Sequence, residues 1–569
     1  MKHLFKTVFA ALLLAGLPAP VRAGSGGGGV GINLASPVDW STAQPFLDLM
    51  KTSRPWIGHG ADEWEVMNWE EMAAQGVFDD HGWPKVIPPG VSSVGTLMLT
   101  DLPEDTAGVA GRYLLRWEGS GEVEVGLGAQ NVDYGAHSAR FDFAPGNGPV
   151  HVVIRTTDPE GTGDHVRNMT LVREDRVALH AEGAVFNPDW LALIDGFEVL
   201  RFMDWMETND STLAHWEDRP EPGDVSYRLN GVPVEIMVRL ANELGAEPWF
   251  TMPHLADDDF VRRFAETVRD GLDPDLRAWV EFSNEVWNWI FDQAHWADAV
   301  AKRTWRRDPR WIQIYAGRAS EVADIWAEVF GAGADARLMR VIATQTGWMG
   351  LEQEILNAGR WVSKGKGRSA PGLHFDAYAV TGYFGGHLAQ GDRVGPLRVW
   401  IAESRAAAEA EADRQGLTGA ARADYIEAHR FDAAVARAAA HLAGADGPAK
   451  GVHDLPHLVD TLFPYHANIA REWDLELVAY EGGSHVVGGG EARDDDALTE
   501  FLVHFNYSPE MAELYRQMFE GWKAAGGGVF AAYSDVARPG RYGSWGHLRH
   551  LGDSNPRWDA LVAARDGRR

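Results

Sequence analysis

Two glutamates, Glu285 and Glu481, stand after short apolar runs that are typical of buried β-strands. The first ends the segment Ala-Trp-Val-Glu-Phe-Ser-Asn-Glu, and the second follows Leu-Val-Ala-Tyr and precedes two glycines. A pair of carboxyl groups can divide one reaction between them, because a protonated group donates its proton while an ionised one acts as base or nucleophile. That chemistry requires the two side chains to meet, although they lie far apart in the chain.

The elements that must bring them together alternate along the chain, with a short β-branched run before each longer amphipathic stretch. This order predicts a parallel sheet with crossover helices, and eight units in succession favour an α/β fold closed into a (β/α)8 TIM barrel. Both glutamates then stand at the carboxyl ends of strands, where such barrels carry their reacting groups. The expected strands cover residues 30–34, 197–202, 248–252, 278–282, 339–344, 375–380, 475–480 and 528–533, and the first expected helices cover about 42–51, 231–244 and 260–270.

One segment, between about residues 91 and 174, departs from this rhythm. Its apolar residues recur with period two and are separated by Gly- and Pro-containing turns, which predicts an antiparallel β-sandwich between the first and second barrel units. Such a module could bind sugar, shape a cleft or have no function. The predicted organisation is a barrel start with a connecting segment at 24–90, the β-rich module at 91–174 and the remaining barrel at 175–569, including a solvated helix pair at about 388–450.

With these strand ends the sequence resembles the clan A glycoside hydrolases. Barrels of that superfamily place an Asn-Glu pair after the fourth strand and a second glutamate at the end of the seventh, and Asn284-Glu285 and Glu481 match those positions. The resemblance follows the barrel by element order and assigns no family. It implies a retaining mechanism with the two carboxylates roughly 5 Å apart, in which Glu285 is the acid/base and Glu481 the nucleophile. A wider separation of roughly 8 Å would indicate inversion instead.

The same resemblance implies supporting residues at other strand ends. Arg201 would hold Glu481 ionised, Tyr383 would donate its hydroxyl to Glu481, and Asn284 would bind a sugar hydroxyl. Several clan A families have a histidine two residues before the tyrosine, where this chain has Thr381. The remaining expected substrate contacts are His254, Trp545, Trp205 and Trp287.

Structural interpretations of the same residues stay open. Glu285 could be a first-turn glutamate favoured by a helix dipole, Glu481 a carboxylate before a Gly-Gly turn, and Arg201 an ordinary ion-pair partner. Residues 257–259 with His254 offer oxygen and nitrogen ligands, but helix capping explains the acidic run more simply. The sequence therefore predicts neither a metal site nor a cofactor.

The composition narrows the possible partners. With 0 Cys there can be no disulfide framework, thiolate zinc site or cysteine nucleophile. A formal charge of -30 disfavours nucleic acid and strongly acidic polymers as partners. A count of 24 tryptophans is high for a chain of this length. Many of them can be core residues, but indole faces also stack on sugar rings, so several are expected to line a groove. A neutral β-linked polysaccharide or oligosaccharide is therefore the expected substrate.

Residues 1–23 have the layout of a secretory signal peptide. Lys2 and Lys6 precede an apolar stretch at 8–17, and Val21-Arg22-Ala23 offers a cleavage site with Ala23 as its last residue, so we expect a periplasmic or extracellular protein. The stretch is too short to span a bilayer comfortably, and no later run replaces it, so no membrane insertion is expected. The sequence leaves the oligomeric state open.

Two other functions fit the same residues. A non-catalytic carbohydrate-binding or matrix protein would keep the barrel and bind sugar without releasing reducing ends. A transglycosylase acting on exopolysaccharide would share the two glutamates and differ in its products.

Overall fold

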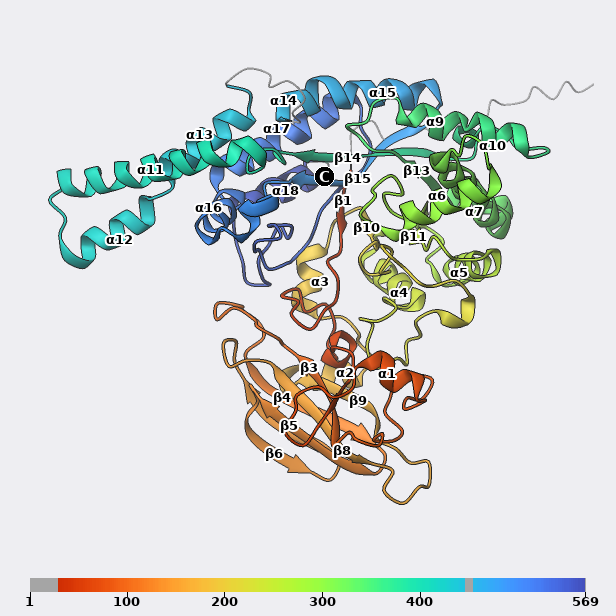
Figure 1. Ribbon diagram of the computed structural model, residues 1–569, viewed down its shortest axis with the longest axis vertical. Coiled ribbons are helices and arrows are strands. Elements are labelled where there is room, and N and C mark those ends of the chain that lie inside the picture. The colour runs from red at the N-terminus through yellow and green to blue at the C-terminus, as the bar shows by residue number, and fades with distance from the viewer. Residues whose placement is uncertain (1–28, 446–453, 568–569) are drawn as a thin grey trace, which may run out of the picture.

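The computed structural model describes residues 29–445 and 454–567, and a closed barrel of eight parallel strands forms its larger part (Figure 1). Each strand pairs with the next, and the last closes on the first through Val30 opposite Phe530. The barrel strands are β1 (Val30–Asn33), β10 (Val199–Arg201), β11 (Glu247–Met252), β12 (Ala278–Phe282), β13 (Leu338–Ala343), β14 (Ala377–Phe384), β15 (Glu476–Ser484) and β16 (Phe530–Ala532). The predicted signal peptide, residues 1–23, lies outside the described residues.

Helices surround the barrel, and local sequence sets the ends of several. Asp257 caps α5 by accepting a hydrogen bond from the Phe260 amide, and Gly245, with φ of 62°, ends α4. These helices are α3 (Pro188–Ile194), α4 (Val234–Leu244), α5 (Asp258–Gly271), α6 (Asp292–Thr304), α7 (Trp311–Phe330), α8 (Ala334–Arg337), α9 (Leu351–Asn357), α10 (Gly359–Lys364), α14 (Leu455–His457), α15 (Phe463–Glu472), α16 (Asp496–Asn506), α17 (Pro509–Ala525) and α18 (Pro556–Asp566).

A β module inserted between β1 and β10 lies beside the barrel (Figure 1). It has two four-stranded antiparallel sheets, in the orders β2-β3-β8-β5 and β6-β7-β4-β9, packed around an apolar core of its own. Its strands are β2 (Ile57–His59), β3 (Ser93–Met98), β4 (Gly111–Glu118), β5 (Gly121–Leu127), β6 (Gln130–Gly135), β7 (Ser138–Phe143), β8 (Val150–Thr157) and β9 (Arg167–Arg173), flanked by α1 (Trp69–Ala74) and α2 (Val177–Ala181). The predicted fold class, a barrel with an antiparallel insertion after its first unit, is confirmed.

Two predicted helical segments differ from the structure. The helix expected at 42–51 is absent, and only a 3₁₀ turn at Leu49–Thr52 forms there. Pro45 lacks an amide hydrogen, and Phe46 instead forms an isolated bridge with Phe186. The expected helix pair after β14 is three helices, α11 (Val394–Arg414), α12 (Gly419–His429) and α13 (Asp432–Leu442), which project from the barrel (Figure 1).

Strands β14 and β15 run four residues beyond their predicted ends. The two strands stay paired from Thr381 opposite Glu481 to Phe384 opposite Ser484, after a register shift that leaves Tyr480 as an extra residue. Gly382 and Gly482 are required here, because a Cβ on either would lie 2.4 or 2.3 Å from the Phe530 ring. A bulge of this kind changes the direction of neighbouring side chains, so Glu481 lines the cavity while the buried Tyr480 donates its hydroxyl to Glu285.

Candidate active site

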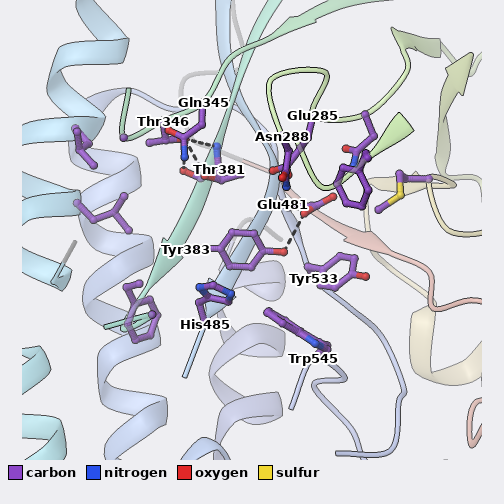
Figure 2. A pocket seen from close by; sticks show the side chains of 18 of the residues that line it. Glu285, Asn288, Gln345, Thr346, Thr381, Tyr383, Glu481, His485, Tyr533 and Trp545 are labelled. Atoms are coloured by element: carbon purple, nitrogen blue, oxygen red, sulfur yellow. Dashed lines mark hydrogen bonds between the residues drawn. The ribbon is translucent and has the colours of Figure 1, made fainter. Parts of the chain in front are cut away.

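A cavity of about 670 Å³ opens at the carboxyl ends of the barrel strands, and both glutamates line it (Figure 2). Residues after β10, β12, β13, β14, β15 and β16 contribute to its wall. The side chains with polar groups on this wall are Asn209, Asn284, Glu285, Asn288, Gln345, Thr346, Thr381, Tyr383, His387, Gln390, Glu481, His485, Tyr533 and Trp545. The two carboxylates therefore share one solvent-accessible space.

Glu481 is held from two sides. Arg201 donates from Nη1 to its Oε1 at 2.7 Å, and Tyr383 donates its hydroxyl to Oε2 at 3.0 Å (Figure 2). The residue is 6% exposed, and burial raises the pKa of Glu481 to about 8; Arg201 opposes this shift and the charge of Glu285 adds to it. The carboxylate is thus fixed in orientation, and its raised pKa lies close to neutral pH.

Arg201 does not serve Glu481 alone. The fully buried guanidinium also donates to Oε2 of Glu281, from Nε at 3.3 Å and from Nη2 at 3.0 Å, and Trp249 donates its indole N–H to the same oxygen at 3.0 Å. Asn33 and Asn284 accept its remaining hydrogen bonds through their side-chain oxygens. One positive charge is therefore divided between two buried carboxylates.

Glu285 lies in a different environment at the end of β12. It accepts hydrogen bonds from the Tyr480 hydroxyl at 2.8 Å and from Asn288 Nδ2 at 2.9 Å, and it is half-buried. Both Ser283 and Glu285 adopt the left-handed backbone region, with φ of 60° and 41°, which costs free energy for residues with a Cβ. Strain of this kind concentrates at functional sites, and here it surrounds Asn284 and turns Glu285 toward the cavity.

The two surroundings suit two different tasks. A carboxylate held by a guanidinium and a phenol keeps its oxygens aimed in one direction, as a nucleophile requires. A partly exposed carboxyl with neutral hydrogen-bond donors can exchange protons with bound ligand and water. The arrangement can therefore supply one group for attack and one for proton transfer.

The structure separates the other predicted site residues into two groups. Asn284 and Trp545 line the cavity: Asn284 donates to Asn209 Oδ1 at 3.1 Å, and the Trp545 ring lies 6.0 Å from that of Tyr383. His254, Trp205 and Trp287 are buried and lie outside the cavity wall.

Each of these three buried side chains packs within the protein. Trp205 donates its indole N–H to the Ala35 carbonyl at 3.1 Å and stacks on Trp190. His254 lies against Trp296, where burial lowers its pKa, and the ring of Trp287 packs edge-on to that of Tyr315. For these three residues the structure shows packing contacts, and their contact with substrate stays a prediction.

Several cavity residues were missed by the sequence analysis. Tyr533 ends the predicted eighth strand and donates its hydroxyl to Asp204 at 3.0 Å, and burial raises the pKa of Asp204 to about 6. Gln345 follows β13, and His485 follows β15 and packs beside Trp545. Their position at strand ends was the available signal. Glu281 had no such signal, because it lies within a strand.

Within residues 29–445 and 454–567, no group of three or more His, Cys, Asp or Glu side chains is placed to bind a metal ion. No helix in the same ranges combines the length and apolar character needed to cross a bilayer.

Comparison with known proteins yields no sequence match: no family model matches the chain, and neither does any curated protein. Among solved structures, fungal β-1,4-galactanases align at 11% identity over 68% of this chain and 95% of theirs, with a TM-score of 0.31. A GH5-4 broad-specificity endoglucanase from Clostridium longisporum aligns at 11% identity over 64% of this chain and 95% of its own, also with a TM-score of 0.31. Similarities this distant do not indicate a function. The fold is defined by the strand order of the barrel itself.

Proposed function

We propose that this protein is a retaining glycoside hydrolase of clan A type, acting on a β-linked polysaccharide or oligosaccharide. The observation that carries the proposal is the pair of carboxylates at the ends of β12 and β15, which line one cavity in two distinct environments. Arg201 and Tyr383 hold Glu481, as a nucleophile requires, while Glu285 has only neutral donors beside it.

In the first step Glu481 attacks the anomeric carbon and Glu285 protonates the departing glycosidic oxygen. The bond to the leaving group breaks as the ester bond to Glu481 forms, so the positive charge of Arg201 loses one of its anionic partners. In the second step Glu285, now ionised, takes a proton from water, and the water oxygen displaces Glu481. Asn284, with its amide directed along the cavity wall, is positioned to bind a sugar hydroxyl beside the reacting carbon.

Ionisation of Glu481 sets the expected pH dependence. The attacking form is the carboxylate, and the pKa of Glu481 is raised to about 8, so activity should increase as the pH rises toward that value. Tyr383 and Arg201 stabilise the ionised form, whereas the charge of Glu285 opposes it.

Chemical rescue tests the assignment. Glu481→Gly should lose hydrolysis of an activated aryl β-glycoside, and azide should restore turnover and give a glycosyl azide of inverted configuration. Glu285→Gln should lower kcat on a substrate with a poor leaving group by about 10²–10⁴-fold. Full hydrolytic activity in Glu285→Gln or Glu481→Gln would overturn the proposal.

Product analysis distinguishes a retaining hydrolase from an inverting hydrolase, a binding protein and a transglycosylase. Retained configuration of the first-formed sugar, followed by NMR, supports the double displacement, and inversion contradicts it. Sugar binding without new reducing ends would indicate a binding or matrix protein, and longer products would indicate a transglycosylase.

We also propose that the protein is secreted to the periplasm or the outside of the cell after removal of residues 1–23. N-terminal sequencing of protein recovered from the periplasmic or culture fraction tests this, with Gly24 as the expected first residue. An intact Met1 on active protein in the cytoplasm would contradict it.

A further inference from the structure

Exposed aromatic side chains of the barrel gather at one end of it. Among the described residues, the barrel's strongly exposed aromatic rings are those of Trp40, Trp289, Trp348 and Tyr542. They follow β1, β12, β13 and β16, so all four lie on loops at the carboxyl ends of strands, around the candidate active site. Large exposed apolar groups concentrated on one face commonly mark a binding surface.

The four residues stand on two opposite sides of the mouth. In the closed order of eight strands, β12 is four strands from β16, and β13 is four strands from β1. The loops that carry Trp289 and Trp348 therefore leave the barrel on the side opposite the loops that carry Tyr542 and Trp40. A ligand that contacts both pairs must cross the whole opening.

The cavity connects these two sides. Asn288 and Phe291 flank Trp289 in the chain and line the cavity, as does Gly347 beside Trp348. On the opposite side the Trp545 ring lines the cavity and its indole N–H donates to the Tyr542 carbonyl at 2.9 Å. The exposed rings thus continue the surface on which Glu285 and Glu481 lie.

Two strongly exposed indoles lie on the β12 and β13 side. Trp289 is 45% exposed and Trp348 is 52% exposed. The guanidinium of Arg228 lies 5.9 Å from the centre of the Trp40 ring, and that of Arg541 lies 5.0 Å from the centre of the Tyr542 ring. Within the part of the chain that the structure describes, no such cation lies over Trp289 or Trp348, although Trp289 makes edge contacts with the rings of His295 and Trp311. These two indoles can stack on a ligand, and they lie on the side of the cavity that carries Glu285.

We propose that the mouth binds an extended, uncharged polysaccharide chain that crosses the cavity and stacks on Trp289 and Trp348. The inference rests on the proposed function and adds that the substrate is a polymer cleaved at internal bonds, because the chain continues past both sides of the carboxylate pair. Sugar rings present apolar faces to indole and hydroxyl groups to side chains such as Asn209 and Gln345. The formal charge of -30 disfavours an anionic chain.

Binding without turnover provides the test. Glu285→Gln protein is run on native gels containing a soluble β-1,3/1,4-glucan, a β-1,4-mannan or a β-1,4-galactan, and retardation gives the dissociation constant. We expect at least one polymer to retard the protein, and Trp289→Ala with Trp348→Ala to weaken that binding by about 10-fold or more. The matched control is Trp64→Ala, which removes an indole that is 49% exposed on the β module and should leave binding unchanged.

The outcomes distinguish this inference from the proposed function. An unchanged urea-unfolding midpoint of the double tryptophan variant shows that its fold is intact, and weakened binding of polymer then supports the inference. Retardation without hydrolysis by the wild-type protein supports the polymer site and contradicts the hydrolase. Equal retardation of wild-type and double variant, loss of binding in Trp64→Ala alone, or no retardation by any of the three polymers overturns the inference.

Discussion

The barrel and the β module each contain an arginine paired with glutamate, and the two pairs differ in burial. In the module, Arg155 donates to Glu124 at 2.8 Å, and both side chains are about half-exposed, at 45% and 44%. In the barrel, the Arg201 side chain is 0% exposed and pairs with those of Glu281 and Glu481, which are also buried. Forming the exposed pair changes the free energy of folding little, because both groups stay hydrated. The buried triad loses the hydration of its charged groups, and its mutual attractions must offset that cost.

This difference indicates which part of the molecule keeps buried charged residues for a reason other than stability. The module's core cluster is apolar, and its arginine–glutamate pairs lie at the surface. The barrel instead keeps an arginine with two glutamates buried under its cavity. A core of apolar residues would often be as stable as such a cluster, so its presence supports a chemical role for this end of the barrel.

The largest expected effect comes from removing the buried cation. Arg201→Met leaves Glu281 and Glu481 without a counter-charge, which should lower the free energy of unfolding by about 3–5 kcal/mol and abolish hydrolysis. Urea titration followed by circular dichroism, alongside an activity assay, measures both. Unchanged stability would show that the buried triad has no electrostatic requirement for Arg201.

Part of this arrangement was predictable from the sequence, because strand ends carry function in a parallel barrel. The fourth strand was predicted with the bounds it has, and Asn284, Glu285, Glu481, Tyr383 and Trp545 all line the cavity. Proximity to a strand end does not reveal which way a side chain points. Trp205 and His254 stand at suitable positions and pack inward.

The remainder depends on contacts between strands that are distant in sequence. Gly482 and Gly483 were interpreted as a turn, but Gly482 continues β15 because the Phe530 ring needs the space. Glu281 was counted as part of an apolar strand, and only the neighbouring strands show that Arg201 and Trp249 bind it. Arg201 was expected beside Glu481 from the resemblance, but its second partner Glu281 could be identified only from the register of the strands.

The next effect concerns stability against pH. Burial raises the pKa of Glu481 to about 8 and those of Asp204 and Asp535 to about 6, all above the values in an unfolded chain. Protonation of these groups therefore stabilises the folded state; the contribution is full below about pH 4 and is lost as the pH rises through 6 and 8. Between pH 5 and pH 9 the barrel should lose stability on the order of 3 kcal/mol from Glu481.

Glu481→Gln isolates that contribution. The stability of the variant relative to wild type should increase from pH 5 to pH 9, measured by urea titration at each pH. Parallel curves for the two proteins would contradict the pKa shift. The module offers a comparison, because its exposed pair of Arg155 and Glu124 should add no such slope over this range.

A smaller effect tests how the guanidinium of Arg201 is shared between Glu281 and Glu481. In Glu281→Gln the charge of Arg201 is no longer divided, so the pKa of Glu481 should fall, and the acid limb of the pH–activity profile should move to lower pH by about one unit, or about 1.4 kcal/mol. A profile of kcat/KM against pH measures the shift.

Glu247→Gln is the matched control for Glu281→Gln. Glu247 begins β11 and accepts hydrogen bonds from Arg277 Nε at 2.9 Å and from the Trp279 indole at 2.6 Å, so it has the same types of partner far from the cavity. Its loss should affect stability alone and leave the pH profile in place. A profile that moves equally in both variants would assign Glu281 a merely structural role.

The smallest expected effect lies in the β module. Arg155→Ala removes the pair with Glu124 and a 3.2 Å hydrogen bond to Ser93, but both charged groups already contact water, so the free energy of unfolding should change by less than about 1 kcal/mol. High salt should reduce even this change, because exposed pairs are screened, while the effect of Arg201→Met should persist. Measuring both variants at low and high salt therefore tests the comparison directly, since equal salt sensitivity would mean that burial does not separate the two arginines.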